Sequence, residues 1–144
     1  MSGERELSAL KMQKKRVVIT GLGVVAPNGL GVKNFLHAIK NRISGIKHDA
    51  ELERLQFSCQ ISGTPEITEE LKNEYFTALE LKNFNASGIL YGVIAGMEAW
   101  KDAGLSIENN ENPDWDSGTI FGTGTSGIEK FRESIYKIDD FQTR

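Results

Sequence analysis

The segment whose residue types and spacing best suggest chemistry is the glycine-rich stretch Gly122-Thr-Gly-Thr-Ser-Gly127. Its glycines follow the G-x-G-x-x-G pattern, which in dinucleotide-binding proteins lets backbone N–H groups approach a pyrophosphate. Such a turn normally opens a strand–helix–strand unit whose second strand ends in an acidic residue. The sequence reaches Arg144 without that second strand. A dinucleotide-binding module is therefore only a remote alternative.

The residues that could act as nucleophile, base or metal ligand do not form a constellation. Cys59 is the one cysteine, which excludes an internal disulfide and a cysteine-based zinc cage. It falls in the alternating segment 55–61, where an edge strand would point it inward as a small buried residue. His37 lies on the polar face of an expected helix and His48 in a loop, without the spacing of metal ligands. We expect no catalytic residue, metal site or cofactor in this chain.

Composition and charge exclude several classes of partner. The 144 residues carry a formal net charge of −3 without a run of basic residues, so a nucleic-acid partner is not expected. No stretch of about 18 consecutive apolar residues occurs, so a membrane-spanning helix is not expected either. Residues 1–13 lack the apolar core of a signal peptide and are interpreted as a variable leader or extension. The expected location is the cytoplasm.

The stretch from 85 to 104 predicts a long helix around which the rest of the chain is organised. At 100° per residue its small residues share one face, which would let a neighbouring backbone approach closely: Gly88, Gly92, Ala95, Gly96, Ala99 and Ala103. Glu98 and Asp102 lie on a narrow polar edge. We therefore expect a large side chain at Gly92 or Gly96 to damage folding more than loss of the Glu98 carboxylate.

The other segments alternate strand and helix patterns, which is typical of an α/β fold with a parallel sheet. In order along the chain they are a strand at 17–20, a helix at 32–42, an edge strand at 55–61, a short helix from 64 to 76 that covers the long helix or the sheet edge, a strand at 117–121 and a helix at 128–138. Asn85 or Ser87 is expected to cap the long helix, and Gly104 to end it. The strand at 17–20 is expected to be buried on both faces, and with the short strand at 117–121 it is too little for an independent doubly wound domain, so the sheet is expected to be incomplete.

Four stretches occur together in one order: RVVITGLGVVAPNG at 16–29, NRISGI at 41–46, YGVIAGMEAWKDAGL at 91–105 and GTIFGTGTSG at 118–127. In combination they resemble the N-terminal part of the β-ketoacyl-acyl-carrier-protein synthases, condensing enzymes of the thiolase-like fold. The resemblance implies an α/β architecture, the N-terminal portion of a thiolase-like αβαβα layered fold with an incomplete sheet. Residues 14–144 would be the N-terminal β-ketoacyl synthase domain, truncated before the active-site cysteine.

The resemblance also implies an activity for the parent enzyme, a 3-oxoacyl-[acyl-carrier-protein] synthase. Such an enzyme condenses an acyl thioester with malonyl-acyl-carrier protein in fatty acid or polyketide-type synthesis, as a homodimer or a heterodimer with another condensing subunit. In the family a cysteine takes the acyl group and two histidines stabilise the thioester oxyanion. Cys59, His37 and His48 match none of these positions. The chain by itself is therefore expected to be inactive.

The glycine turn is the part of the family's site that the resemblance places in this chain. Thr125 corresponds to a position that faces the acyl pocket near the dimer interface, so Gly124, Thr125 and Ser126 are the expected substrate-pocket residues. Threonine is smaller than the aliphatic residue often found there. A non-catalytic partner, resembling a chain-length factor, is an alternative that keeps the fold and pairs with an active synthase but lacks the nucleophile.

Overall fold

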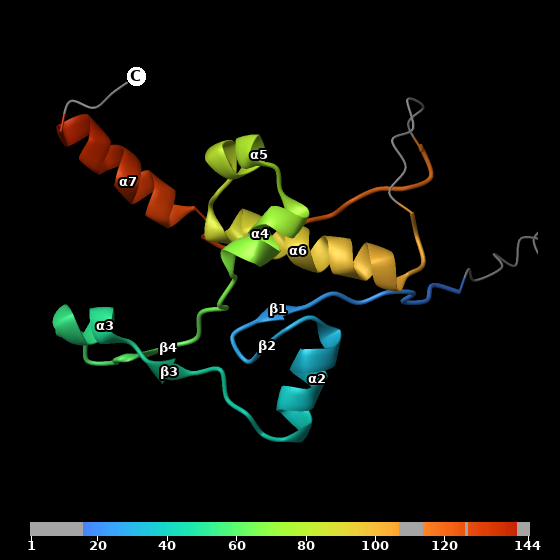
Figure 1. Ribbon diagram of the computed structural model, residues 1–144, viewed down its shortest axis with the longest axis horizontal. Helices are drawn as coiled ribbons and strands as arrows, with labels where there is room; N and C mark the ends of the chain where they lie inside the picture. Colours follow the sequence, from blue (N-terminus) through green and yellow to red (C-terminus); the bar gives the residue numbers. More distant parts are fainter. Residues whose placement is uncertain (1–15, 107–113, 126, 141–144) are drawn as a thin grey trace, which may run out of the picture.

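The computed structural model describes residues 16–106, 114–125 and 127–140 (Figure 1). Its helices are α2 (Val32–Lys40), α3 (Ala50–Arg54), α4 (Glu69–Tyr75), α5 (Ala78–Asn83), α6 (Ser87–Asp102) and α7 (Ile128–Asp139). Its strands are β1 (Val25–Ala26), β2 (Gly29–Leu30), β3 (Lys47–His48) and β4 (Ile61–Ser62). The predicted α/β class is confirmed, and α2, α6 and α7 lie within two residues of the helix ends predicted for them.

The described strands form two short antiparallel ladders and no parallel sheet. β1 and β2 pair across a two-residue turn, with Val25 opposite Leu30. β3 and β4 pair with Lys47 opposite Ser62. Each ladder is only two residues long in each strand, so these strands orient neighbouring segments and do not form a layer of the core.

The strands predicted at 17–20 and 117–121 are wrong for the described structure, in which neither segment pairs with a strand. Their apolar side chains are exposed, with 94% of Val17 and 99% of Ile120 open to solvent. A strand needs a neighbour about 4.8 Å away, and a strand buried on both faces also needs covering layers. The β-branched residues favour an extended strand, but they do not provide the neighbouring strand with which it would pair.

The edge strand predicted at 55–61 is also wrong, because the turn that ends α3 occupies the start of this region and only Ile61 belongs to a strand, β4. The Asp49 carboxylate accepts hydrogen bonds from the N–H groups of Glu51 and Leu52, at 3.0 and 3.2 Å, and so starts α3. Gln56 then takes a left-handed conformation with φ of 56°. Cys59 is exposed, not inward-facing. A local helix cap therefore outweighs the alternating pattern.

The helix predicted from 64 to 76 begins later than expected but packs where it was expected. The Thr68 hydroxyl accepts a hydrogen bond from the Leu71 N–H at 3.3 Å, and α4 starts at the following residue. In Figure 1 α4 lies against α6, whose other contacts include β1. The buried core is small and centres on this packing: Phe76, Leu90 and Ile94, with Val25, Ile67, Leu71, Tyr75, Leu81 and Val93 partly buried around them.

The small face of α6 admits a close backbone neighbour, as the sequence predicts. A Cβ atom added to Gly23 would stand 1.8 Å from the Ala95 carbonyl oxygen, and one added to Gly21 would stand 2.2 Å from that of Ala99. No side chain fits in either place. The segment before β1 therefore lies directly on α6, and the glycines at 21 and 23 are needed for this contact.

The polar edge of α6 holds the same segment. The two carboxylate oxygens of Glu98 accept hydrogen bonds from the N–H groups of Val24 and Val32, each at 2.8 Å. Asp102 accepts one from the Leu22 N–H at 2.9 Å. By contrast, a Cβ atom added to Gly96 would meet nothing within 4 Å. For Gly96 the expected order of importance is therefore wrong, because Glu98 makes the contacts and Gly96 faces open space, whereas a Cβ atom added to Gly92 would lie 3.4 Å from the Phe121 ring.

We expect Glu98→Ala to speed hydrogen exchange at the Val24 and Val32 amides about tenfold or more. A hydrogen bond to a charged group contributes about 1.5–3 kcal/mol, and about 1.4 kcal/mol corresponds to a factor of ten. Exchange measured in the full gene product tests this. Glu74→Ala is the control, because Glu74 is exposed and lies 3.9 Å from Lys101, away from the Val24 and Val32 amides. Equal exchange rates in both variants would contradict the assignment.

Large apolar side chains stay exposed on several elements, including Phe131 of α7 at 67%. We therefore expect the 144-residue chain, produced alone, to self-associate or to unfold without cooperativity, because contiguous apolar patches promote association. Sedimentation velocity over a concentration series and calorimetry measure this. A double variant, Ile120→Asp with Phe131→Asp, should associate less. A monomeric sample that unfolds cooperatively would contradict the expectation.

Candidate functional site

The glycine turn predicted as the substrate-pocket segment leads directly into α7. Gly124 and Thr125 are exposed, and Ser126 lies outside the described residues. Gly127 has φ of 80°, a left-handed conformation that favours glycine, and its carbonyl oxygen accepts the N–H groups of Lys130 and Phe131 at 3.0 Å. The third glycine of the motif therefore forms the start of a helix.

An apolar groove runs along α6 on the side where the glycine turn begins. The part of the groove near the N-terminal half of α6 is a hollow of about 330 Å³. It is lined by Gly88, Ile89, Gly92, Val93, Phe121, Gly122 and Thr123. A second hollow of about 410 Å³ shares Gly92, Val93 and Phe121 and extends past Gly96 to Trp100. The lining is mostly apolar, and it reaches Thr123. Gly124 and Thr125 follow this lining in the chain but do not belong to it.

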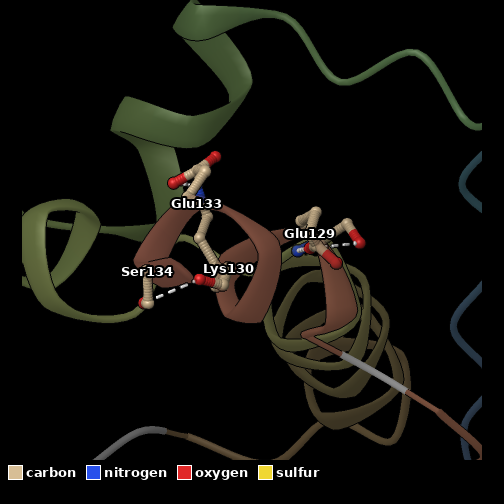
Figure 2. A network of polar contacts seen from close by, with 5 residues as sticks. Glu129, Lys130, Glu133 and Ser134 are labelled. Carbon is tan, nitrogen blue, oxygen red and sulfur yellow. Dashed lines mark hydrogen bonds and ion pairs between the residues drawn. The ribbon is translucent and has the colours of Figure 1, made fainter. Parts of the chain in front are cut away.

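The turn is joined to α6 through Glu129, in the first turn of α7 (Figure 2). Glu129 Oε1 accepts hydrogen bonds from the Ser87 N–H at 2.8 Å and from the Ser87 hydroxyl at 2.9 Å. Both residues are partly buried. Ser87 is the first residue of α6, and the preceding Ala86 offers no capping side chain. The expected cap from Asn85 or Ser87 is therefore wrong, because α7 supplies it.

The Ser87 contact changes the acidity of Glu129. The backbone N–H of Ser87 lowers the pKa of the Glu129 carboxyl below its ordinary value of 4.5, with further contributions from the N–H of Glu129 itself and the Ser87 hydroxyl. The positive end of the α6 dipole favours the carboxylate in the same direction. Glu129 therefore accepts these bonds as an anion at neutral pH.

Among the described residues, the other side-chain hydrogen bonds of α7 join residues of that helix. Figure 2 shows Lys130, Glu133 and Ser134 grouped on α7, apart from Glu129. Lys130 Nζ lies 3.0 Å from Glu133, and the Ser134 hydroxyl donates to the Lys130 carbonyl at 2.8 Å. These contacts stabilise α7 locally and do not fix its place on α6.

The two histidines, which could act as bases or metal ligands, lie apart from each other at the surface. His37 is exposed next to Asn41, and His48 Nε2 lies 3.5 Å from Glu53, so the surface positions predicted for both histidines are confirmed. In the described ranges no three histidine, cysteine or acidic side chains gather as metal ligands would. Within the same ranges, no helix has the length and apolar character needed to span a bilayer.

Comparison with known proteins decides the family. The family model for "Beta-ketoacyl synthase, N-terminal domain" matches residues 14–141, which include α6, the glycine turn and all of α7. The chain belongs to the β-ketoacyl synthase family. The predicted resemblance is thereby confirmed. As a member of this family, the chain has its glycine turn inside the matched N-terminal domain.

Individual relatives agree with this assignment. A 3-oxoacyl-[acyl-carrier-protein] synthase 2 of Coxiella burnetii is 31% identical over 120 residues, covering 81% of this chain and 27% of the relative. The 3-oxoacyl-[acyl-carrier-protein] synthase 2 of Staphylococcus aureus is 31% identical over 141 residues, covering 89% of this chain and 30% of the relative. A 3-oxoacyl-[acyl-carrier-protein] synthase 1 of Buchnera aphidicola is 30% identical, covering 81% and 28%. This β-ketoacyl synthase chain thus spans less than a third of each of these relatives.

We expect the Ser87 amide to report the titration of Glu129. Because the pKa is depressed in the folded state, the contact contributes stability above pH 4.5, and this contribution is lost as the pH falls through the depressed pKa. NMR of serine-labelled protein from pH 7 to 3 should show the Ser87 signal constant down to about pH 5, then shifting with a midpoint below 4.5. Glu129→Gln should abolish this shift. A midpoint at or above 4.5 would contradict the assignment.

Proposed function

We propose that this chain forms the N-terminal part of a 3-oxoacyl-[acyl-carrier-protein] synthase, which condenses an acyl thioester with malonyl-acyl-carrier protein. The observation that carries the proposal is the family match over residues 14–141. The names of the Coxiella and Staphylococcus relatives support it. The parent enzyme would act in fatty acid or polyketide-type synthesis as an acyltransferase, in the cytoplasm, with acyl carrier protein as its partner.

The proposed architecture is the thiolase-like αβαβα layered fold, with residues 14–144 in its N-terminal domain. The run at 17–19 suits a central strand of such a sheet, because its side chains are apolar on both faces. In 117–121, Ile120 and Phe121 would place one apolar side chain on each face. The groove on α6 suits a surface against which a sheet packs, since it is lined mostly by apolar and small residues. The proposed leader, residues 1–13, lies outside the described residues.

The proposed chemistry needs a nucleophile that these residues do not supply. A catalytic cysteine requires a neighbouring base or a helix N-terminus to stabilise its thiolate. Cys59 is exposed and follows the turn after α3, and His37 and His48 lie on other elements. We therefore place the acyl-accepting cysteine and its histidine partners outside this chain, which is inactive when alone. The contribution of the chain is the wall of the acyl pocket at Gly124, Thr125 and Ser126.

A condensation assay of the full gene product tests the proposal. Acyl thioesters of increasing length and malonyl-acyl-carrier protein are supplied, and the 3-oxoacyl product and released carbon dioxide are measured. Product formed in a one-to-one ratio with carbon dioxide supports a synthase. A protein that forms no product alone, but pairs with an active synthase and restores its activity, would be the non-catalytic partner instead.

We expect Thr125→Phe in the full gene product to impose a steep upper limit on acyl length while leaving short primers nearly unaffected. The larger ring would fill space that a growing chain needs, and each methylene excluded from an apolar pocket costs about 0.8 kcal/mol. Condensation rates are measured against primer length for both proteins. Thr123→Ser, on the same segment, is the control and should keep the wild-type length profile. A uniform loss at every length would contradict the pocket assignment.

A further inference from the structure

The position of the glycine turn depends on what holds α7 to the rest of the molecule. In the described ranges the side-chain hydrogen bonds between α6 and α7 are the two that Ser87 donates to Glu129. Gly127 adds only a loose contact, since a Cβ atom placed there would lie 4.0 Å from the Ala86 side chain. Most of α7 is exposed, so packing does little to fix it. Glu129 is thus the anchor at the α7 end of the turn.

The other end of the turn lies beside α6. A Cβ atom added to Gly92 would lie 3.4 Å from the Phe121 ring, so this ring, although 69% exposed, lies next to α6 at a point five residues beyond Ser87. Phe121 and Glu129 therefore both lie beside the same helix. A chain segment held at both ends has fewer conformations than one held at a single end.

We infer that Glu129 is a positioning residue that, by holding Ser87, sets the place of the Gly122–Gly127 turn and so the acyl length accepted beside Thr125. This inference rests on the proposed function, because it assumes that Thr125 lines the acyl pocket. In this inference Glu129 acts on the substrate only indirectly, through its two hydrogen bonds with Ser87. Glu129 follows Gly127 by two residues and acts through the backbone of the turn.

The chain offers matched variants for a test. Glu129→Ala removes the acceptor of both bonds. Glu129→Gln keeps an oxygen that can accept both, since both bonds end on the same atom, Oε1, and loses only the charge. Glu133→Ala is the control, because Glu133 lies one turn further along α7 and pairs with Lys130 of the same helix.

The first measurement is the condensation rate of the full gene product against acyl primer length. For Glu129→Ala we expect the ratio of rates for long and short primers to rise about threefold or more, because a released turn yields to a longer chain. Glu129→Gln and Glu133→Ala should keep the wild-type ratio. Equal loss at all lengths, or no change in Glu129→Ala, would overturn the inference and leave Glu129 with a stabilising role only.

The second measurement does not depend on catalysis. Hydrogen exchange of residues 122–127 should be faster in Glu129→Ala than in the wild type and unchanged in Glu133→Ala. Unchanged exchange in Glu129→Ala would overturn the inference whatever the activity. If the wild-type protein condenses no primer, the proposed function fails, and with it the role in acyl length. The exchange result then still decides whether Glu129 holds the turn.

Discussion

Carboxylates from other helices cap the two helices on which this structure depends. The first four N–H groups of a helix lack partners within it, and its N-terminus carries a partial positive charge. The residues before α2 and α6 have no capping side chain. Glu98 of α6 instead accepts the Val32 N–H of α2, and Glu129 of α7 accepts the Ser87 N–H of α6. Each contact satisfies a helix end and also fixes where one helix lies against another.

The small face and the polar edge of α6 work together in this arrangement. Glycine at 21 and 23 brings the chain close to α6, where the bond from the Val24 N–H is part-buried, and an unpaired buried N–H is costly. Glu98 and Asp102 lie four residues apart beside that face and accept the N–H groups of the approaching segment. Close packing without these carboxylates would leave donors unpaired. The small face and the adjacent polar edge of α6 thus form one contact surface for the segment before β1.

The sequence could predict those features that depend on local pattern. Helices α2, α6 and α7 follow from apolar periodicity, and the family follows from short stretches that keep their order. Whether 17–20 and 117–121 pair as strands could not be predicted from their own residues, because a strand depends on a neighbour elsewhere in the chain. The caps at Glu98 and Glu129 join residues 66 and 42 positions apart, which no local rule connects. The pocket role of Thr125 stays a prediction.

The direction of these caps matters for a chain made from its N-terminus. In both cases the carboxylate comes later in the sequence than the helix it caps, by 66 residues for α2 and 42 for α6. At a synthesis rate of roughly 5–20 residues per second, α2 waits about 3–13 s for its partner and α6 about 2–8 s. During that time the first N–H group of each helix lacks its carboxylate partner. Glu98 is made before Glu129, so the cap of α2 becomes available before the cap of α6, in the order of the chain.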